Sequence, residues 1–235
     1  MKAEADGVAP AARAAAQRRA AEEQLARVEE ALAQLPEVEA AKRRNGTKSA
    51  ARVSTTDPDA RVMKLADGGF RPAYNVQFAT DVDGQAVVGV AVTQGGEAAA
   101  LLPMLDQVQA RTQRRPGAYF ADGGFVSTAG IVGVAARGVP LYAPVPEGPR
   151  APGAGDGPMD PAVAAWRARM ATAAAKTLYR VRAATAERLN GDTKRYRGMQ
   201  TVPVRGLPKV HTWALWVALA VNMLRALDIV PHLMT

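Results

Sequence analysis

Two stretches of the sequence carry carboxylates in surroundings that suit chemistry. The first reads AYFADGGF, where Asp122 follows a short apolar run and precedes two glycines. Such a run favours a buried strand, and a carboxylate at the end of a strand, with glycines leaving room beside it, suits a metal ligand. The competing interpretation is an Asp-Gly turn without chemistry, and this stretch alone favours the turn.

The second carboxylate, Glu187, lies in YRVRAATAERLNGDTK, an alanine-rich stretch that predicts a helix. At about 100° per residue, Tyr179 and Glu187 fall within an arc of about 80°, and Arg182 lies about 60° to the other side of Tyr179. Gly191 is expected to end this helix, so Lys194 is not assigned to that face. Ordinary solvated charges are the alternative, and helical spacing alone favours them.

Composition limits the other kinds of site. The chain has 235 residues, of which 48% are hydrophobic, so it can bury a substantial core. It has no cysteine, which removes disulfides, thiolate nucleophiles and zinc-thiolate sites, and its two histidines, His211 and His232, lie far from both acids in the sequence. A metal site in this chain would therefore depend on carboxylates.

Charge and hydropathy bear on partners and location. The formal net charge of +8 favours a polyanionic partner such as DNA about as much as it favours an ordinary basic surface. The start MKAEADGVAP lacks the apolar stretch of a signal peptide, so a cytoplasmic location is expected. The uncharged apolar run over residues 212–224 has 13 residues, fewer than the roughly 18 of a membrane span, and favours a buried helix.

The first half of the chain is expected to hold a helix, a linker and a hairpin. Residues 11–44 carry a narrow apolar stripe, which predicts a helix that is kinked or restarted at Pro36 and packs on the domain rather than forming a coiled coil. Residues 45–61 are polar and favour a linker or a long surface loop. Residues 74–78 and 86–94 alternate around the turn sequence DVDG, which predicts an antiparallel hairpin.

Helices and short strands alternate after this hairpin. A helix over residues 98–108 is followed by the strand that ends in Asp122, by a helix capped at Ser127 or Thr128, and by a strand over residues 139–145. The order β-β-α-β-α-β predicts an α/β fold with one mixed sheet and helices on its faces.

Two further helices are expected in the last third of the chain. The first runs from about residue 163 to residue 190. The second is expected to pack its large apolar residues into the core, and stacking of its tryptophans on DNA is the minor alternative. These large residues are Trp213, Trp216, Leu219, Met223 and Leu227.

Several motifs together resemble the DDE transposases of bacterial insertion sequences, and among them the branch with a Tyr-Arg-Glu-Lys signature. The similar stretches are STTDPDARVMKLADGGFRPAYNVQFATD, YFADGGF, PAVAAWRARM, RAATAE and RGLPKV, and the similarity covers most of the chain from about residue 20 onward. The resemblance implies a ribonuclease H-like fold in which three carboxylates hold two Mg²⁺ or Mn²⁺ ions for DNA cleavage and strand transfer.

By position in these motifs, Asp122 matches the second catalytic, metal-binding acid of the family and Glu187 the third. Tyr179, Arg182 and Lys194 match the signature residues that contact DNA near the cleavage site or support the glutamate. The assignment of Arg182 is the less secure, because four residues separate it from Glu187 where the commonest form of the signature has three.

The first aspartate of the family pattern has no match. Asp6 has no apolar strand before it, and Asp81 and Asp83 stand in the predicted hairpin turn. The expected organisation is a helical insert and basic linker over residues 1–52, a partial catalytic domain lacking its first strand over residues 53–200, and a packing helix over residues 201–235.

The resemblance thus predicts a C-terminal transposase portion that is inactive by itself. Its partners would be the DNA ends of an insertion sequence, and a second copy or a separately encoded N-terminal half, with no membrane. The alternative from another functional class is a non-catalytic, basic DNA-binding or oligomerising remnant.

Overall fold

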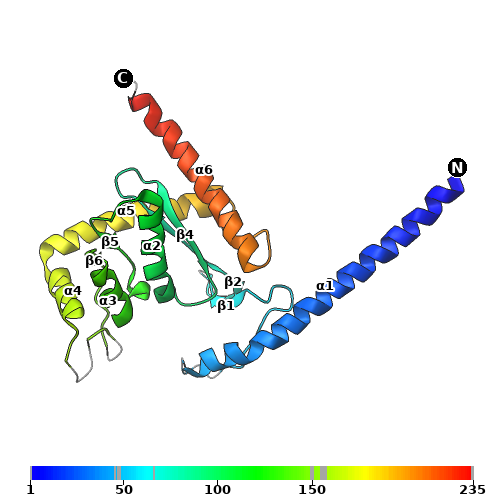
Figure 1. Ribbon diagram of the computed structural model, residues 1–235, viewed down its shortest axis with the longest axis horizontal. Coiled ribbons are helices and arrows are strands. Elements are labelled where there is room, and N and C mark those ends of the chain that lie inside the picture. The colour runs from blue at the N-terminus through cyan, green and yellow to red at the C-terminus, as the bar shows by residue number, and fades with distance from the viewer. Residues whose placement is uncertain are drawn as a thin grey trace. The chain divides into compact units, whose positions relative to one another are not determined.

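The computed structural model describes residues 2–44, 46, 49–65, 67–148, 151–153 and 158–233, without the side chains of residues 2–9, 181–184 and 229–233. The chain divides into two compact units, and Figure 1 labels helices and strands. Unit 1 contains Met1–Tyr74 and Arg205–Leu207, and unit 2 contains Asn75–Val204 and Pro208–Thr235.

Unit 1 begins with one long helix, α1 (Lys2–Arg44), which passes without interruption through Pro10 and Pro36. The expected restart at Pro36 therefore does not occur. Each proline removes one backbone donor, and the strong helix formers around it, mostly Ala, Glu and Arg, maintain the helix on both sides. Within the expected apolar stripe, Leu25 and Leu32 are exposed while the intervening Ala31 is buried.

The loop after α1 is anchored rather than a free linker. The hydroxyl of Tyr74 donates to both carboxylate oxygens of Asp57 at 2.8 Å, and the amide of Gly206 donates to Asp57 Oδ1 at 3.2 Å. The amide of Leu207 donates to Asp59 Oδ2 at 2.7 Å, which caps the start of the last helix. Burial and the bond to Asp57 raise the pKa of Tyr74, so its phenol stays a donor.

A short antiparallel hairpin, β1 (Arg61–Lys64) and β2 (Phe70–Ala73), completes unit 1 and was not expected from the sequence. Its turn depends on local chemistry: the carboxylate of Asp67 accepts from the amide of Gly69 at 2.9 Å, and Gly68 has a φ of +82°. An aspartate followed by two glycines between short alternating runs was the available signal for this hairpin.

Unit 2 is a mixed α/β structure. Its strands and helices are β3 (Asn75–Thr80), β4 (Val87–Thr93), the 3-10 helix η1 (Glu97–Ala100), α2 (Leu101–Thr112), β5 (Tyr119–Phe120), the 3-10 helix η2 (Gly123–Phe125), α3 (Thr128–Ala136), β6 (Leu141–Tyr142), α4 (Pro161–Ala171), α5 (Ala173–Tyr196) and α6 (Leu207–Leu233, from Pro208 onward). Over residues 75–142 this is the predicted order of elements. The Ser127 side chain caps α3 by accepting from Gly130, and Gly138 follows the helix at a φ of +68°.

The strands of unit 2 do not form the single mixed sheet that was expected. Among the described residues, β3 pairs only with β4, antiparallel, and β5 pairs only with β6, parallel. The hairpin turn uses Asp81 as predicted, because its Oδ2 accepts from the amide of Gly84 at 2.6 Å. The two ladders are separate half-sheets.

Each half-sheet has its own hydrophobic core. Leu101, Leu105, Ile131, Val134 and Trp166 belong to the core around β5 and β6, which α2, α3 and α4 cover. A second core joins the β3–β4 hairpin to Leu189 of α5 and to one face of α6. Both cores lie within unit 2.

The face of α6 that packs on the hairpin is the opposite of the predicted one. The helix buries small residues, namely Val210, Ala214, Val217, Ala218 and Val221. It exposes the large ones Trp216, Leu219, Met223 and Leu227 and leaves Trp213 half-buried. Small side chains let the helix approach the strands closely, which explains the choice of face. Within the described part of the chain, one stretch, Leu207–Asp228, could cross a membrane by length and composition, a test that core helices of soluble proteins also pass.

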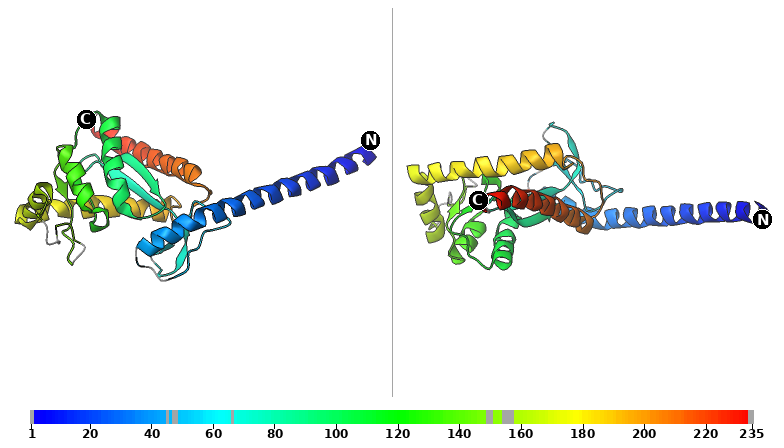
Figure 2. Two further views of the ribbon diagram at one scale, coloured as in Figure 1. Left: turned by 60° about the horizontal axis from the view of Figure 1, so that its bottom comes forward. Right: turned by 90° about the horizontal axis from the view of Figure 1, so that it is seen from above.

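The predicted long helix before α6 is two helices. α4 ends at Thr172, whose hydroxyl accepts from the amide of Ala175 at 3.1 Å and so caps α5. α5 then continues through Gly191 to Tyr196, as one uninterrupted helix (Figure 2), so Gly191 does not end it. An interior glycine weakens a helix by only about 1 kcal/mol, which the helical residues on either side offset.

Candidate active site

Asp122 lies immediately after β5, as the sequence predicts. The amide of Ala121 donates to the carbonyl of Tyr142 at 3.0 Å, which fixes the end of β5 against β6. Asp122 has extended backbone geometry and an exposed side chain, and its carbonyl accepts from the amide of Phe125 at 3.1 Å, which closes η2. The strand therefore ends in a sharp turn at Asp122, whose side chain is accessible to solvent.

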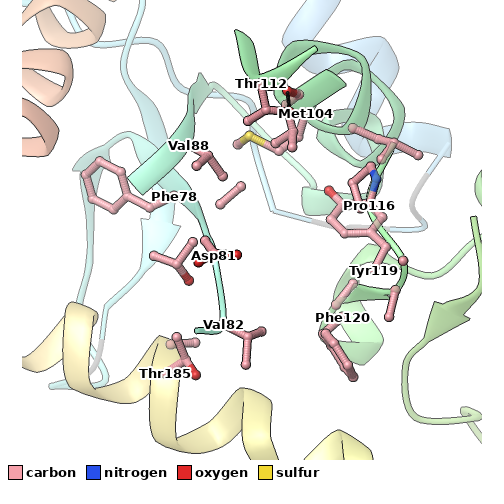
Figure 3. A pocket seen from close by; sticks show the side chains of 18 of the residues that line it. Phe78, Asp81, Val82, Val88, Met104, Thr112, Pro116, Tyr119, Phe120 and Thr185 are labelled. Atoms are coloured by element: carbon pink, nitrogen blue, oxygen red, sulfur yellow. Dashed lines mark hydrogen bonds between the residues drawn. The ribbon is translucent and has the colours of Figure 1, made fainter. Parts of the chain in front are cut away.

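Asp122 stands on the wall of a pocket of about 880 Å³ between the two half-sheets. Phe78 and Asp81 lie across the open space from Tyr119 and Phe120, and Thr185 projects from α5 (Figure 3). The predicted acid thus belongs to the lining of a large concave site, as a functional acid would.

The helix that carries Glu187 reaches the same pocket. Thr185 and Ala186 line it, while the exposed side chain of the next residue, Glu187, is not part of the lining. The hydroxyl of Tyr179 donates to the carbonyl of Ala121 at 3.2 Å, which ties α5 to the residue before Asp122. The structure thus places Asp122 and the helix of Glu187 beside one pocket, with Tyr179 connecting them.

The remaining signature residues lie along α5. Because α5 continues through Gly191, Lys194 is on the helix, seven residues after Glu187 and therefore about 20° from it around the axis. Lys194 is exposed and lies on the same face of α5 as Glu187, a placement that the sequence alone did not assign. Arg182 is in α5, but its side chain lies outside the described residues. His211 is half-buried on α6 and the side chain of His232 is not described.

Sequence reasoning missed two polar groups of the pocket. Gln77, on β3, is 9% exposed, and neither its amide nitrogen nor its amide oxygen has a hydrogen-bond partner in the described structure. The hydroxyl of Tyr119 donates to the carbonyl of Leu101 at 3.2 Å, and burial raises the pKa of its phenol. In the alternating sequence NVQFAT, the side chain of Gln77 lies on the other face of the strand from those of Val76 and Phe78. The sequence does not show that the fold covers both faces of this strand and so buries Gln77.

The donor set for a divalent metal is incomplete over the part of the chain that the structure describes. The oxygens of Asp122 and Glu187 are of the kind that Mg²⁺ or Mn²⁺ prefers. Among the described residues, however, no group of three or more acidic, histidine or cysteine side chains is close enough together to hold an ion. Two carboxylates on different elements could share a metal only with further ligands.

A comparison with models of known protein families gives a match for part of the chain. The family model described as "Transposase DDE domain" matches residues 159–227, which comprise α4, α5 and most of α6. The matched segment contains Tyr179, Glu187 and Lys194 but not Asp122. Neither the curated proteins nor the solved structures give a significant match. The family match supports a DDE transposase, a class that acts on DNA and generally uses divalent metal ions.

Proposed function

We propose that this chain is the catalytic-domain portion of a DDE transposase from a bacterial insertion sequence, of the branch with the Tyr-Arg-Glu-Lys signature. It would have a ribonuclease H-like fold and act in the cytoplasm on the DNA ends of its element. It would contribute the second and third acids, Asp122 and Glu187, to metal-dependent cleavage and strand transfer.

The observation that carries this proposal is the hydrogen bond between the Tyr179 hydroxyl and the Ala121 carbonyl. It joins the helix of the family match to the strand end that bears Asp122, although the two lie 58 residues apart. In this reading Tyr179 is a positioning residue, because it holds α5 against β5 without touching the reacting atoms. Lys194, on the Glu187 face, would meet DNA phosphate.

Asp122 and Glu187 would be the metal ligands of this chain. In the family, the ions stabilise the attacking and leaving oxygens of the phosphodiester. With two acids the site lacks a ligand, so we expect no cleavage or strand transfer by this chain alone. A third carboxylate would have to come from a segment outside the described residues or from another chain.

The test is Mn²⁺ binding measured by calorimetry on the full chain, with Asp122→Asn and Glu187→Gln as isosteric variants. Glu147→Gln, an exposed acid of unit 2, is the matched control. We expect weak binding that both site variants lose and the control keeps. Equal binding by all four proteins, or no binding by the unchanged chain, would show that these acids do not form a shared site.

The second candidate function is that of a non-catalytic DNA-binding or oligomerising protein, which the net charge of +8 favours. The two candidate functions can be distinguished by measuring DNA binding as the fluorescence anisotropy of a fluorescein-labelled duplex between roughly 50 and 200 mM salt. DNA binding that weakens with salt and survives both acid substitutions, together with no Mn²⁺ binding, favours the second function. DNA binding that Lys194→Ala reduces, together with Mn²⁺ binding, favours the first.

A further inference from the structure

The large pocket of unit 2 lies against strand edges rather than against a sheet face. A pocket on a face would touch every second residue of a strand, because side chains alternate between the two faces. Here every residue from Gln77 to Val82, and every residue from Arg114 to Asp122, contributes to the lining. The pocket is therefore a slot between the edges of β3 and β5.

On the β3 side, the backbone groups of Phe78 are directed into the slot. Its partner in the ladder is Val90, whose amide donates to Gln107 Oε1 at 2.6 Å and whose carbonyl accepts from Gln107 Nε2 at 3.2 Å. The groups of Val90 thus point away from β3. In an antiparallel ladder the opposite residue then directs its own N–H and C=O away from β4.

On the β5 side, the same reasoning applies to Phe120. The amides of Tyr119 and Ala121 donate to β6, to the carbonyls of Pro140 and Tyr142 at 2.9 and 3.0 Å. The backbone groups of the residue between them alternate to the other side, toward the slot. β3 and β5 each have no second strand partner among the described residues.

The outer edge of β4, by contrast, is closed by side chains. Gln107 of α2 binds both backbone groups of Val90, and Asn222 of α6 binds both backbone groups of Val87 at 2.7 and 2.8 Å. These amides occupy the places that a neighbouring strand would take, which protects the edge. The edges that face the slot have no such closure among the described side chains.

The walls of the slot define the chemistry of its occupant. Met104, Leu105 and Val108 of α2 form an apolar floor, and the small residues Thr185 and Ala186 of α5 contribute to the opposite wall. Ala79 faces α2, since a side chain at its ladder partner Gly89 would meet both Ala79 and Met104. Phe78 packs in the core that includes Leu189 of α5. α2 and α5 therefore cover opposite faces of the hairpin.

The slot also has a buried polar side chain and a charged residue at each end. The amide of Gln77 is buried without a partner in the described structure, and it can be satisfied by a polar group that enters the slot. Arg114 and Arg115 line the end of the slot where β5 begins, and Asp122 lines the end where β5 stops. A segment that is acidic at its start and basic at its end would match these charges when it runs parallel to β5.

We propose that the slot binds an extended segment of a polypeptide other than a second copy of this chain, and that this segment pairs with β3 and β5 and joins the two half-sheets into one. The segment is about five residues long, the usual length of a strand. It has aliphatic side chains toward α2 and small or polar side chains toward α5. DNA is a poor occupant, because it offers no regular backbone N–H and C=O groups to pair with the strand edges. The inference depends on the strand edges, not on the proposed function.

The test is binding of a fluorescein-labelled peptide, Glu-Val-Thr-Val-Thr-Val-Lys, to the full chain, followed by fluorescence anisotropy without metal or DNA. The variant Phe120→Pro removes the N–H on the slot side of β5 and leaves the bonds to β6 intact. Phe120→Ala is its matched control, because it loses the same ring and keeps the N–H. We expect the proline variant to bind at least tenfold more weakly than the alanine variant.

Two measurements make the result decisive. The same peptide with N-methylated valines keeps its side chains but cannot donate from those valines to the strand that their amides face, so its binding should weaken at least tenfold. Equal binding of both peptides would overturn the proposal. No peptide binding by the unchanged chain, or a dimer in sedimentation that Phe120→Pro dissociates, would also overturn it. None of these outcomes alters the Mn²⁺ result.

Discussion

Replacing Asn222 with alanine should destabilise unit 2 far more than its half-exposed position on α6 suggests. The side chain accepts from the Val87 amide at 2.7 Å and donates to the Val87 carbonyl at 2.8 Å. Val87 is 7% exposed, so both backbone groups would lose their partner where water has little access. A lost hydrogen bond that leaves a buried group unsatisfied costs about 1 to 3 kcal/mol. For the pair we expect roughly 2 to 3 kcal/mol.

For a chain of this length, such a loss lowers Tm by roughly 4 to 12 °C. The assay is urea and thermal unfolding followed by circular dichroism. Gln109→Ala on α2 is the control, since its half-buried side chain makes no hydrogen bond in the described structure. Gln107→Ala should resemble Asn222→Ala, because Gln107 binds Val90 in the same way. The reasoning fails if Asn222→Ala unfolds at the same urea concentration as the Gln109 control.

The substitution Asn222→Asp adds a pH dependence to the same prediction. The introduced carboxylate keeps the bond from the Val87 amide but faces the Val87 carbonyl, which raises its pKa in the folded state. A raised folded pKa means that the native state binds the proton more tightly, so the variant gains stability as pH falls through that pKa. The difference from the unchanged chain should narrow between neutral and acidic pH, and a constant difference would contradict the geometry.

Three smaller predictions concern other contacts. Tyr179→Phe removes the donor to the Ala121 carbonyl and should cost about 0.5 to 1.5 kcal/mol in urea unfolding, with weaker Mn²⁺ binding if the hydroxyl positions α5. Asp106 is paired with Arg137 at 2.5 Å, and this hydrogen bond lowers the pKa of Asp106. The destabilisation by Asp106→Asn should therefore be present at neutral pH and vanish as pH falls below the ordinary aspartate range. Trp166→Phe should change stability by less than about 1 kcal/mol, because the smaller ring removes a buried indole N–H that lacks a partner in the described structure.

Features that depend on neighbouring residues could be predicted from the sequence. The β3–β4 hairpin, the turn at Asp81, the Ser127 cap and the glycine after α3 each follow from residues within a few positions of one another. Asp122 at the end of β5 also follows, because an apolar run and an Asp-Gly pair mark a strand end. Such signals need no knowledge of the rest of the fold.

Features that depend on distant contacts could not be predicted. The buried face of α6 is chosen by the hairpin, which accepts the small residues Ala214 and Ala218 and leaves Trp216 exposed, whereas hydrophobicity alone favours the larger side chain. Gly191 stays within α5 because the residues around it maintain the helix. The slot depends on two ladders that remain apart, and residue order alone predicts that they join.

The two hydrophobic cores of unit 2 have a consequence for cooperativity. The core around Leu101 and Trp166 and the core around Val90 and Ala218 each contain their own ladder, so each can open while the other stays closed. Amide hydrogen exchange should then show two classes of protected amides with different opening free energies. A strand bound between β3 and β5 would link the ladders by hydrogen bonds, and the two classes would merge into one cooperative unit.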